Sequence, residues 1–119
     1  MPHLQLEYAE ELVGPEGLPG LLAVVHAAAR DTGLFVESHI RVRARPVAHY
    51  LVGGERAPFA HVELRIRAGR HSHHHRLLAD AVVAALQPQL PTAALSAEVV
   101  EINDQGYTRH YPEPEEDRP

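Results

Sequence analysis

The stretch IRVRARPVAHYLVGGERAPFAHVELRIR, residues 40–67, decides the fold because it contains two segments with the two-residue period of a β-strand. Apolar side chains alternate with arginines over residues 40–45, and with histidine or charged side chains over residues 60–67. Between them lies VGGERAP, residues 52–58, whose glycines and proline predict a hairpin-like turn. Pro46 has no N–H to donate, so it ends the first strand or places it at a sheet edge.

A helix is predicted on each side of this pair of strands. Before it, LPGLLAVVHAAARDTG carries apolar residues at helical spacing, with Pro19 at its start and Gly33 just past its end, as these residue types prefer. After it, apolar spacing predicts a helix from Ser72, a residue type that caps helix N-termini, to about Gln87.

Two further strands complete the pattern, over residues 3–8 and 95–102. The order is therefore β-α-β-β-α-β, an α+β fold in which two helices cover one face of a four-stranded mixed sheet. The other face carries arginine, histidine and glutamate. It is either exposed or covered by partner subunits, and the second option predicts a symmetric oligomer. We predict one domain over residues 1–111 and a disordered, acidic, proline-rich tail over residues 112–119.

Composition excludes several classes of chemistry. The chain has 119 residues and a formal net charge of −5, so nucleic acid is not an expected partner. It has no cysteine, which excludes disulfides, thiolate metal ligands and cysteine nucleophiles, and no lysine, which excludes a Schiff-base mechanism. No apolar run suits a membrane span, and no signal peptide is apparent, so we expect a soluble cytoplasmic protein without a membrane partner.

Pro2 is a candidate general base. If Met1 is removed, the ring nitrogen of Pro2 becomes a free secondary amine fixed at the start of a strand. Nearby arginines and partial burial both lower the pKa of such an amine, which brings it towards neutrality. The alternative is that Pro2 simply begins the strand, where a proline is tolerated.

Two arginines are candidate carboxylate ligands. A guanidinium binds a carboxylate through two parallel hydrogen bonds and stabilises negative charge on a dienolate oxygen. Arg41 lies on the strand of alternating arginines, and Arg70 lies just before the second helix, where anions are favoured. For Arg43 and Arg45 we favour the alternative, which is exposure to solvent or pairing with carboxylates.

The histidines allow more than one interpretation. In HSHHH, His71 and His75 are four residues apart and could face the same way on a helix, as metal-binding histidines do. We favour exposed histidines at a helix start, because no carboxylate lies within the cluster. His3 and His61 could reach the site or be structural.

The segments MPHLQLEYAEEL, LPGLL, TGLF, IRVRA and FAHVELRIRAGR occur in an order that resembles the 5-carboxymethyl-2-hydroxymuconate isomerase family. This family belongs to the tautomerase superfamily, with 4-oxalocrotonate tautomerase and macrophage migration inhibitory factor. The resemblance covers residues 2–87 well and the fourth strand loosely. It implies a trimer with active sites near subunit interfaces, an N-terminal proline as the base, and no metal or organic cofactor. It matches Pro2 to that proline, and Arg41 and Arg70 to the arginines that hold substrate carboxylates.

The resulting hypothesis is a homotrimeric isomerase that shifts a proton and a C=C bond in a dienol or enone di- or tricarboxylic acid. The nearest specific substrate is 5-carboxymethyl-2-hydroxymuconate, from homoprotocatechuate breakdown. Pro2 and Arg41 are its catalytic residues, and Arg41, Arg70 and His3 bind the substrate. One alternative is another reaction of this scaffold, dehalogenation or decarboxylation, for which Glu7 and Tyr8 are the available residues. A second alternative is a non-enzymatic trimer that binds a ligand or a metal.

Overall fold

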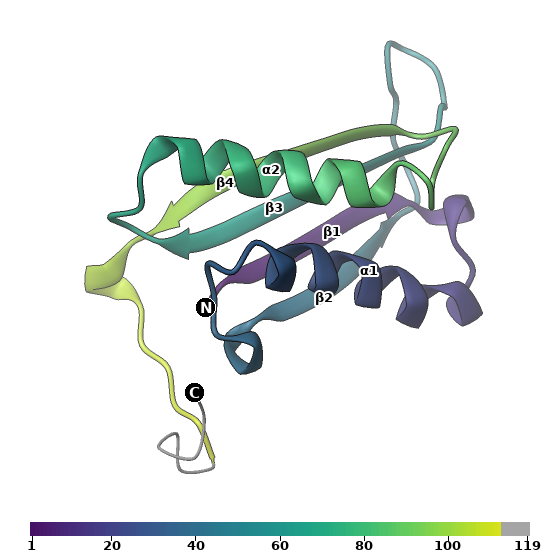
Figure 1. Cartoon of the computed structure of the whole chain (residues 1–119). Coiled ribbons are helices and arrows are strands. Elements are labelled where there is room, and N and C mark those ends of the chain that lie inside the picture. The colour runs from purple at the N-terminus through teal and green to yellow at the C-terminus, as the bar shows by residue number, and fades with distance from the viewer. Residues whose placement is uncertain (113–119) are drawn as a thin grey trace.

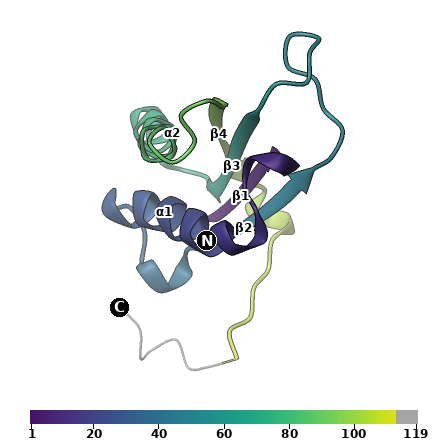
Figure 2. The same ribbon diagram turned by 90° about the vertical axis from the view of Figure 1, so that its right-hand side faces the viewer.

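The computed structural model describes residues 1–112 and contains the predicted order of elements. Figure 1 shows two helices lying along a twisted four-stranded sheet, and Figure 2 shows both helices on the same side of that sheet. The elements are β1 His3–Ala9, α1 Leu18–Asp31, β2 Arg41–Val47, β3 Phe59–Arg67, α2 Ser72–Leu86 and β4 Ala94–Ile102. The predicted α+β fold is confirmed.

The sheet has the strand order β2-β1-β3-β4. β1 and β2 are parallel and joined through α1, and β3 and β4 are parallel and joined through α2. The two β-α-β halves meet where β1 pairs antiparallel with β3. Each parallel pair needs a long crossover connection, which the helix supplies while covering the sheet.

The predicted hairpin-like turn forms locally, but the strands on its two sides do not pair with each other. Val52 and Glu55 form a bridge around Gly53 and Gly54, which both have positive φ angles. β1 lies between β2 and β3, so the 48–58 connection passes from one side of β1 to the other. β2 is consequently an edge strand, which explains how it accommodates Pro46.

The core lies between the helices and the sheet. Alternate residues of β1 and β3 are buried, as the period-two pattern predicted, and each helix contributes one buried stripe. The largest fully buried side chains from these elements are Leu4, Leu6, Leu64, Ile66, Leu78, Leu86, Val25, Val62 and Val82. This packing fixes the helices on one face and leaves the charged residues on the other.

One helix boundary differs from the prediction. Ser72 is the first residue of α2, and His71 is its N-cap, with the ring Nδ1 accepting a hydrogen bond from the backbone N–H of His73 at 3.2 Å. The cap therefore comes from a ring nitrogen one residue earlier than the expected hydroxyl.

All four strands contribute to one end of the sheet. Pairing places the starts of β1 and β2 beside the ends of β3 and β4, with His3 opposite both Arg41 and Arg65. After β4, residues 103–112 continue past this end (Figure 1). The predicted disordered tail lies, except for residue 112, outside the described residues. Neither helix in the described part of the chain is long and apolar enough to cross a membrane.

Candidate active site

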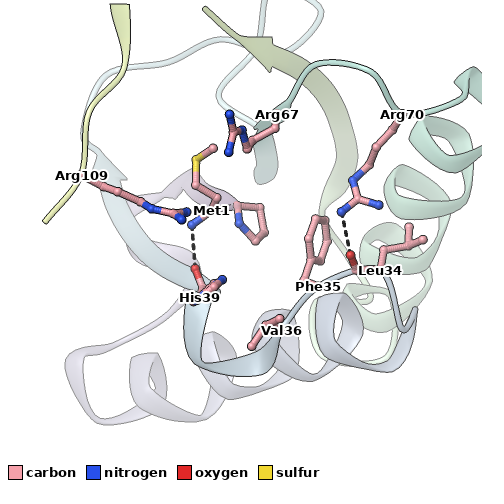
Figure 3. Close-up of a pocket in the computed structure, with 9 residues that line it drawn as sticks. Met1, Leu34, Phe35, Val36, His39, Arg67, Arg70 and Arg109 are labelled. Carbon is pink, nitrogen blue, oxygen red and sulfur yellow. Dashed lines mark hydrogen bonds between the residues drawn. The ribbon is translucent and has the colours of Figure 1, made fainter. Parts of the chain in front are cut away.

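A cavity of about 250 Å³ opens at this end of the sheet. Figure 3 shows its walls: the first two residues of the chain, the segment between α1 and β2, and arginines that point inward from three sides. The lining residues are Met1, Pro2, Leu34, Phe35, Val36, His39, Arg67, Arg70 and Arg109. The cavity thus combines an apolar wall, a main-chain amine and three guanidinium groups.

The chain's α-amine is held against this cavity. The Met1 amine donates a hydrogen bond to the carbonyl oxygen of His39 at 2.8 Å, and the Met1 residue is only 7% exposed. Burial, followed by the positive charges of Arg41 and Arg109, lowers the pKa of the Met1 amine from 8.0 to about 5. An amine at this position is therefore neutral at pH 7, which is the protonation state that a base requires.

Arg70 is fixed against the apolar wall. Its Nη2 donates to the carbonyl oxygen of Leu34 at 2.7 Å, and its guanidinium lies 5.0 Å from the centre of the Phe35 ring. These two contacts order the guanidinium at the cavity, as a carboxylate ligand requires.

Arg41 lies beside the amine but is not among the residues that line the cavity. Its backbone N–H donates to the carbonyl oxygen of Pro2 at 3.0 Å, and its Nη1 donates to the carbonyl oxygen of His39 at 3.3 Å. The guanidinium also lies 5.3 Å from the Tyr111 ring centre. Arg41 therefore acts on the Met1 amine through its positive charge.

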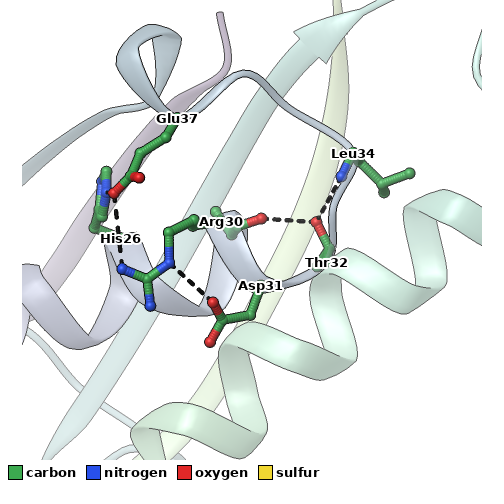
Figure 4. A network of polar contacts seen from close by, with 7 residues as sticks. His26, Arg30, Asp31, Thr32, Leu34 and Glu37 are labelled. Carbon is green, nitrogen blue, oxygen red and sulfur yellow. Dashed lines mark hydrogen bonds and ion pairs between the residues drawn. The ribbon is translucent and has the colours of Figure 1, made fainter. Parts of the chain in front are cut away.

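The apolar wall is held in place by polar contacts to α1 (Figure 4). His26 Nε2 lies 2.8 Å from Glu37 Oε2, which ties the start of the short 3-10 helix Glu37–His39 to α1. At the end of α1, the Thr32 hydroxyl donates to the Ala29 carbonyl at 2.7 Å and accepts from the Leu34 N–H at 3.3 Å. The segment that presents Phe35 is thus fixed at both ends.

His3 lies on the charged face of the sheet, beside the cavity rather than in its lining. Its Nε2 is 3.0 Å from the Tyr107 hydroxyl, and its Nδ1 is 3.2 Å from Arg43 Nη1. Burial is the main cause that lowers the pKa of His3 from 6.5 to about 4, and the N-terminal amine and neighbouring arginines add to it. His3 is therefore neutral at pH 7, and substrate binding by it stays a prediction.

The residues invoked for the alternative reactions lie elsewhere. Tyr8 is buried in the core, and Glu7 pairs with Arg45 at 3.8 Å, towards the opposite end of β1. In the histidine cluster, His71 Nδ1 and His73 Nδ1 are 2.7 Å apart. Within residues 1–112, no group of three or more histidine or acidic side chains is arranged to hold a metal ion.

Sequence reasoning did not identify six residues of the lining as site residues: Leu34, Phe35, Val36, His39, Arg67 and Arg109. Arg67 ends the third predicted strand, but its position beside the chain start follows from the antiparallel pairing of β1 with β3, which the strand pattern does not specify. For Arg109 no local signal exists, because it follows β4 in a segment without a periodic pattern.

Comparisons with known proteins identify a family and structures with a similar fold. The family profile described as 5-carboxymethyl-2-hydroxymuconate isomerase matches residues 2–112. A crystal structure of a 5-carboxymethyl-2-hydroxymuconate isomerase from Deinococcus radiodurans R1 is 30% identical, with a TM-score of 0.78 over 92% of this chain and 88% of that chain. The comparison with curated protein sequences gave no match.

Two other solved structures extend the likeness. A 5-carboxymethyl-2-hydroxymuconate delta-isomerase is 25% identical, with a TM-score of 0.72 over 93% of this chain and 88% of that chain. A fused 4-OT, described as a symmetric trimer, is 19% identical and has a TM-score of 0.72 over 92% of this chain and 94% of that chain, which shows a shared fold. Because the family profile spans nearly all of the described residues, the chain belongs to the 5-carboxymethyl-2-hydroxymuconate isomerase family.

Proposed function

We propose that this protein is a tautomerase-type isomerase that uses the Pro2 amine, exposed by removal of Met1, as its general base and acid. The observation that carries the proposal is the placement of the chain's amine at the wall of a cavity with three arginines. Family membership supports an isomerase of this type.

The electrostatics of the cavity support a neutral proline. Once Met1 is removed, the Pro2 nitrogen takes over as the terminal amine at the same end of β1, close to Arg41. Burial and the arginine charges, which lower the pKa of the Met1 amine, act in the same direction on a Pro2 amine. The neutral amine accepts a proton from the hydroxyl or a carbon of a dienol and returns it to a different carbon.

The arginines suit a substrate that carries carboxylates. Arg70 is ordered to bind one carboxylate, and Arg41 adds positive charge where negative charge develops on the dienolate oxygen. The substrate class is therefore a dienol or enone di- or tricarboxylic acid. The specific reaction we propose is conversion of 5-carboxymethyl-2-hydroxymuconate to its conjugated oxo isomer.

We further propose a homotrimer. The sheet face opposite the helices is lined by charged and polar residues of all four strands, and a subunit interface would cover it. Two structural relatives are described as symmetric trimers. Three copies related by rotation would form a closed ring through this interface.

The test is Pro2→Ala in protein whose mass shows that Met1 is gone. The substrate is 5-carboxymethyl-2-hydroxymuconate, and its ketonisation and isomerisation are followed by ultraviolet absorbance. We expect kcat to fall by about 10²-fold or more, which is the usual contribution of a positioned general base. Retention of full activity by folded, trimeric Pro2→Ala would overturn the proline mechanism.

A matched control is the same sequence with Met1 retained. Its Pro2 nitrogen is part of an amide and accepts no proton, so any activity of this form depends on the Met1 amine, and Pro2→Ala should not lower that activity further.

A further inference from the structure

The segment that follows β4 runs past the chain start and is anchored there by two tyrosines. Among residues 103–112, only Tyr107 and Tyr111 are partly buried, and the others are exposed. The Tyr107 hydroxyl lies 3.0 Å from Nε2 of His3, and the two rings meet edge-on with 5.8 Å between their centres. Between the two tyrosines, Arg109 projects into the cavity (Figure 3). The segment therefore adds a charged group to the cavity and is held beside it by aromatic contacts.

Tyr111 contacts two residues that surround the chain's amine. Its ring is stacked on the ring of His39, with 5.5 Å between the centres and 26° between the planes. The carbonyl oxygen of His39 accepts hydrogen bonds from the Met1 amine at 2.8 Å and from Arg41 Nη1 at 3.3 Å. The Arg41 guanidinium lies 5.3 Å from the centre of the Tyr111 ring, within the range of a cation–π contact. One aromatic ring thus contacts both the residue that binds the amine and the arginine whose charge acts on it.

The ring of Tyr111, and not its hydroxyl, makes these contacts. The hydroxyl oxygen is buried and forms no hydrogen bond with any residue of the described range 1–112. The guanidinium of Arg109 lies 5.5 Å from the centre of the same ring. The electron-rich face of an aromatic ring attracts and orders a guanidinium, which an aliphatic side chain cannot do. We therefore expect phenylalanine, but not leucine, to replace Tyr111 without loss of these contacts.

The charged and titratable side chains around the amine come from every element that meets at this end of the sheet. They are His3 of β1, His39 of the 3-10 helix, Arg41 of β2, Arg67 of β3, Arg70 before α2 and Arg109 after β4. Arg67 in turn pairs with Asp104 at 3.4 Å. After burial, the charge of Arg41 is the largest cause that lowers the pKa of the Met1 amine. A displacement of Arg41 should therefore be visible as a rise in the pKa of the amine.

We propose that Tyr111 is a positioning residue for the base, and that it holds the Arg41 guanidinium and the His39 carbonyl against the chain's amine. Tyr111 does not line the cavity, so it acts through these two neighbours and not on the substrate. The inference rests on the proposed function only in treating the amine as the base. It gives the segment after β4 a part in the reaction, although Tyr111 contacts none of the reacting atoms.

Nitrogen-15 NMR of the terminal amine tests the proposal without any substrate. Met1-free protein is prepared with isotope-labelled proline, and the signal of the amine is identified by its absence in Pro2→Ala. If the mass shows that Met1 is retained, labelled methionine reports the amine instead, because Met1 is the only methionine in the chain. In Tyr111→Leu we expect the pKa of the amine to rise by roughly half a pH unit or more. Tyr111→Phe should match the wild type.

Two controls separate positioning from a general loss of structure. Tyr50→Leu is the matched substitution, because the Tyr50 ring also carries an arginine, Arg56, at 4.5 Å, but lies beyond the opposite end of β2. It should leave the pKa of the amine unchanged. In an Arg41→Gln background, Tyr111→Leu should raise the pKa by less than it does in the wild type, because the arginine that it positions is gone.

Three results would overturn the proposal. They are an unchanged pKa of the amine in folded Tyr111→Leu, an equal rise in Tyr111→Phe, and a full additional rise when Tyr111→Leu is combined with Arg41→Gln. Far-ultraviolet circular dichroism shows whether each variant is folded. Tyr111→Ile, which also lacks an aromatic ring, is measured in parallel so that the test does not depend on one variant.

The outcome is separable from that of the proline test. In the activity assay, Tyr111→Leu should lower kcat/KM by about threefold on the acidic limb of the pH profile and change it little above pH 7, since half a pH unit is about a threefold change in protonation. A raised amine pKa in Tyr111→Leu, together with full activity of Pro2→Ala, would refute the base alone. An unchanged amine pKa, together with an inactive Pro2→Ala, would refute the positioning role alone.

Discussion

At the level of single residues, the α-amine has the most altered chemistry in the site. The pKa of the Met1 amine falls from 8.0 to about 5. Burial removes hydration from its charged form, and the positive charges of Arg41 and Arg109 disfavour a positive charge on the amine. A general base must be unprotonated to accept a proton. Activity is therefore lost at pH values below the pKa of the base and rises as the pH increases through that pKa. In the Met1-free enzyme that we propose, the Pro2 amine is subject to the same causes.

We therefore predict an acidic limb in the pH profile of kcat/KM that lies below the ordinary α-amino range of about 7.7–8.0. Arg41→Gln removes one positive charge beside the amine, so it should move this limb to higher pH by roughly half a pH unit or more. The measurement is kcat/KM from pH 4 to 9 for both proteins. A limb that stays in place in Arg41→Gln would show that Arg41 does not set the pKa of the base.

At the level of secondary-structure elements, the end of α1 determines how the apolar wall is presented. Gly33 has φ = 74°, and it leads the chain from Thr32 into the segment that carries Phe35. A Cβ at Gly33 would meet no atom within 4 Å, so only the backbone conformation restricts this position. The left-handed conformation after a helix is one that glycine adopts without steric cost.

We predict that Gly33→Ala lowers the free energy of unfolding by about 1 kcal/mol, because alanine is strained at positive φ. Gly20→Ala is the matched control. Gly20 lies within α1, and its added Cβ also meets nothing within 4 Å. Since alanine favours helices, Gly20→Ala should raise stability by about 0.5–1 kcal/mol. Urea denaturation measures both, and equal effects of the two substitutions would contradict the backbone explanation.

At the level of the whole molecule, the sheet has one covered face and one face free for association. Val100 pairs with Arg65 on the face opposite the helices, whereas Ala84 is exposed on α2. If the free face is the trimer interface, a new charge at Val100 is desolvated in the trimer without a partner, which is costly. A charge at Ala84 remains in water.

We predict that the wild type sediments at three times the 13.1 kDa of one chain. Val100→Glu should shift the protein towards monomers, and Ala84→Glu should leave the trimer intact. Analytical ultracentrifugation at micromolar concentration distinguishes these results. A monomeric wild type, or a trimer unaffected by Val100→Glu, would exclude this face as the interface.

The sequence by itself determined the elements, their order and the face that each one buries. Alternation over residues 3–8 and 60–67 and helical spacing over residues 18–33 report directly on local backbone geometry, so these predictions were confirmed. It also singled out Pro2 and Arg70, both of which line the cavity. His71 replaced Ser72 as the cap because cap geometry depends on the path of the preceding loop.

Only the tertiary structure decided which strands pair and which distant side chains meet. An alternation with a period of two specifies which face of a strand is buried, but not which strand pairs with it. The 52–58 turn likewise did not indicate that β1 lies between β2 and β3. That placement brings the ends of β3 and β4 beside the chain start. Arg67 and Arg109 reach the same cavity as Pro2 for this reason, although they are distant from it in sequence.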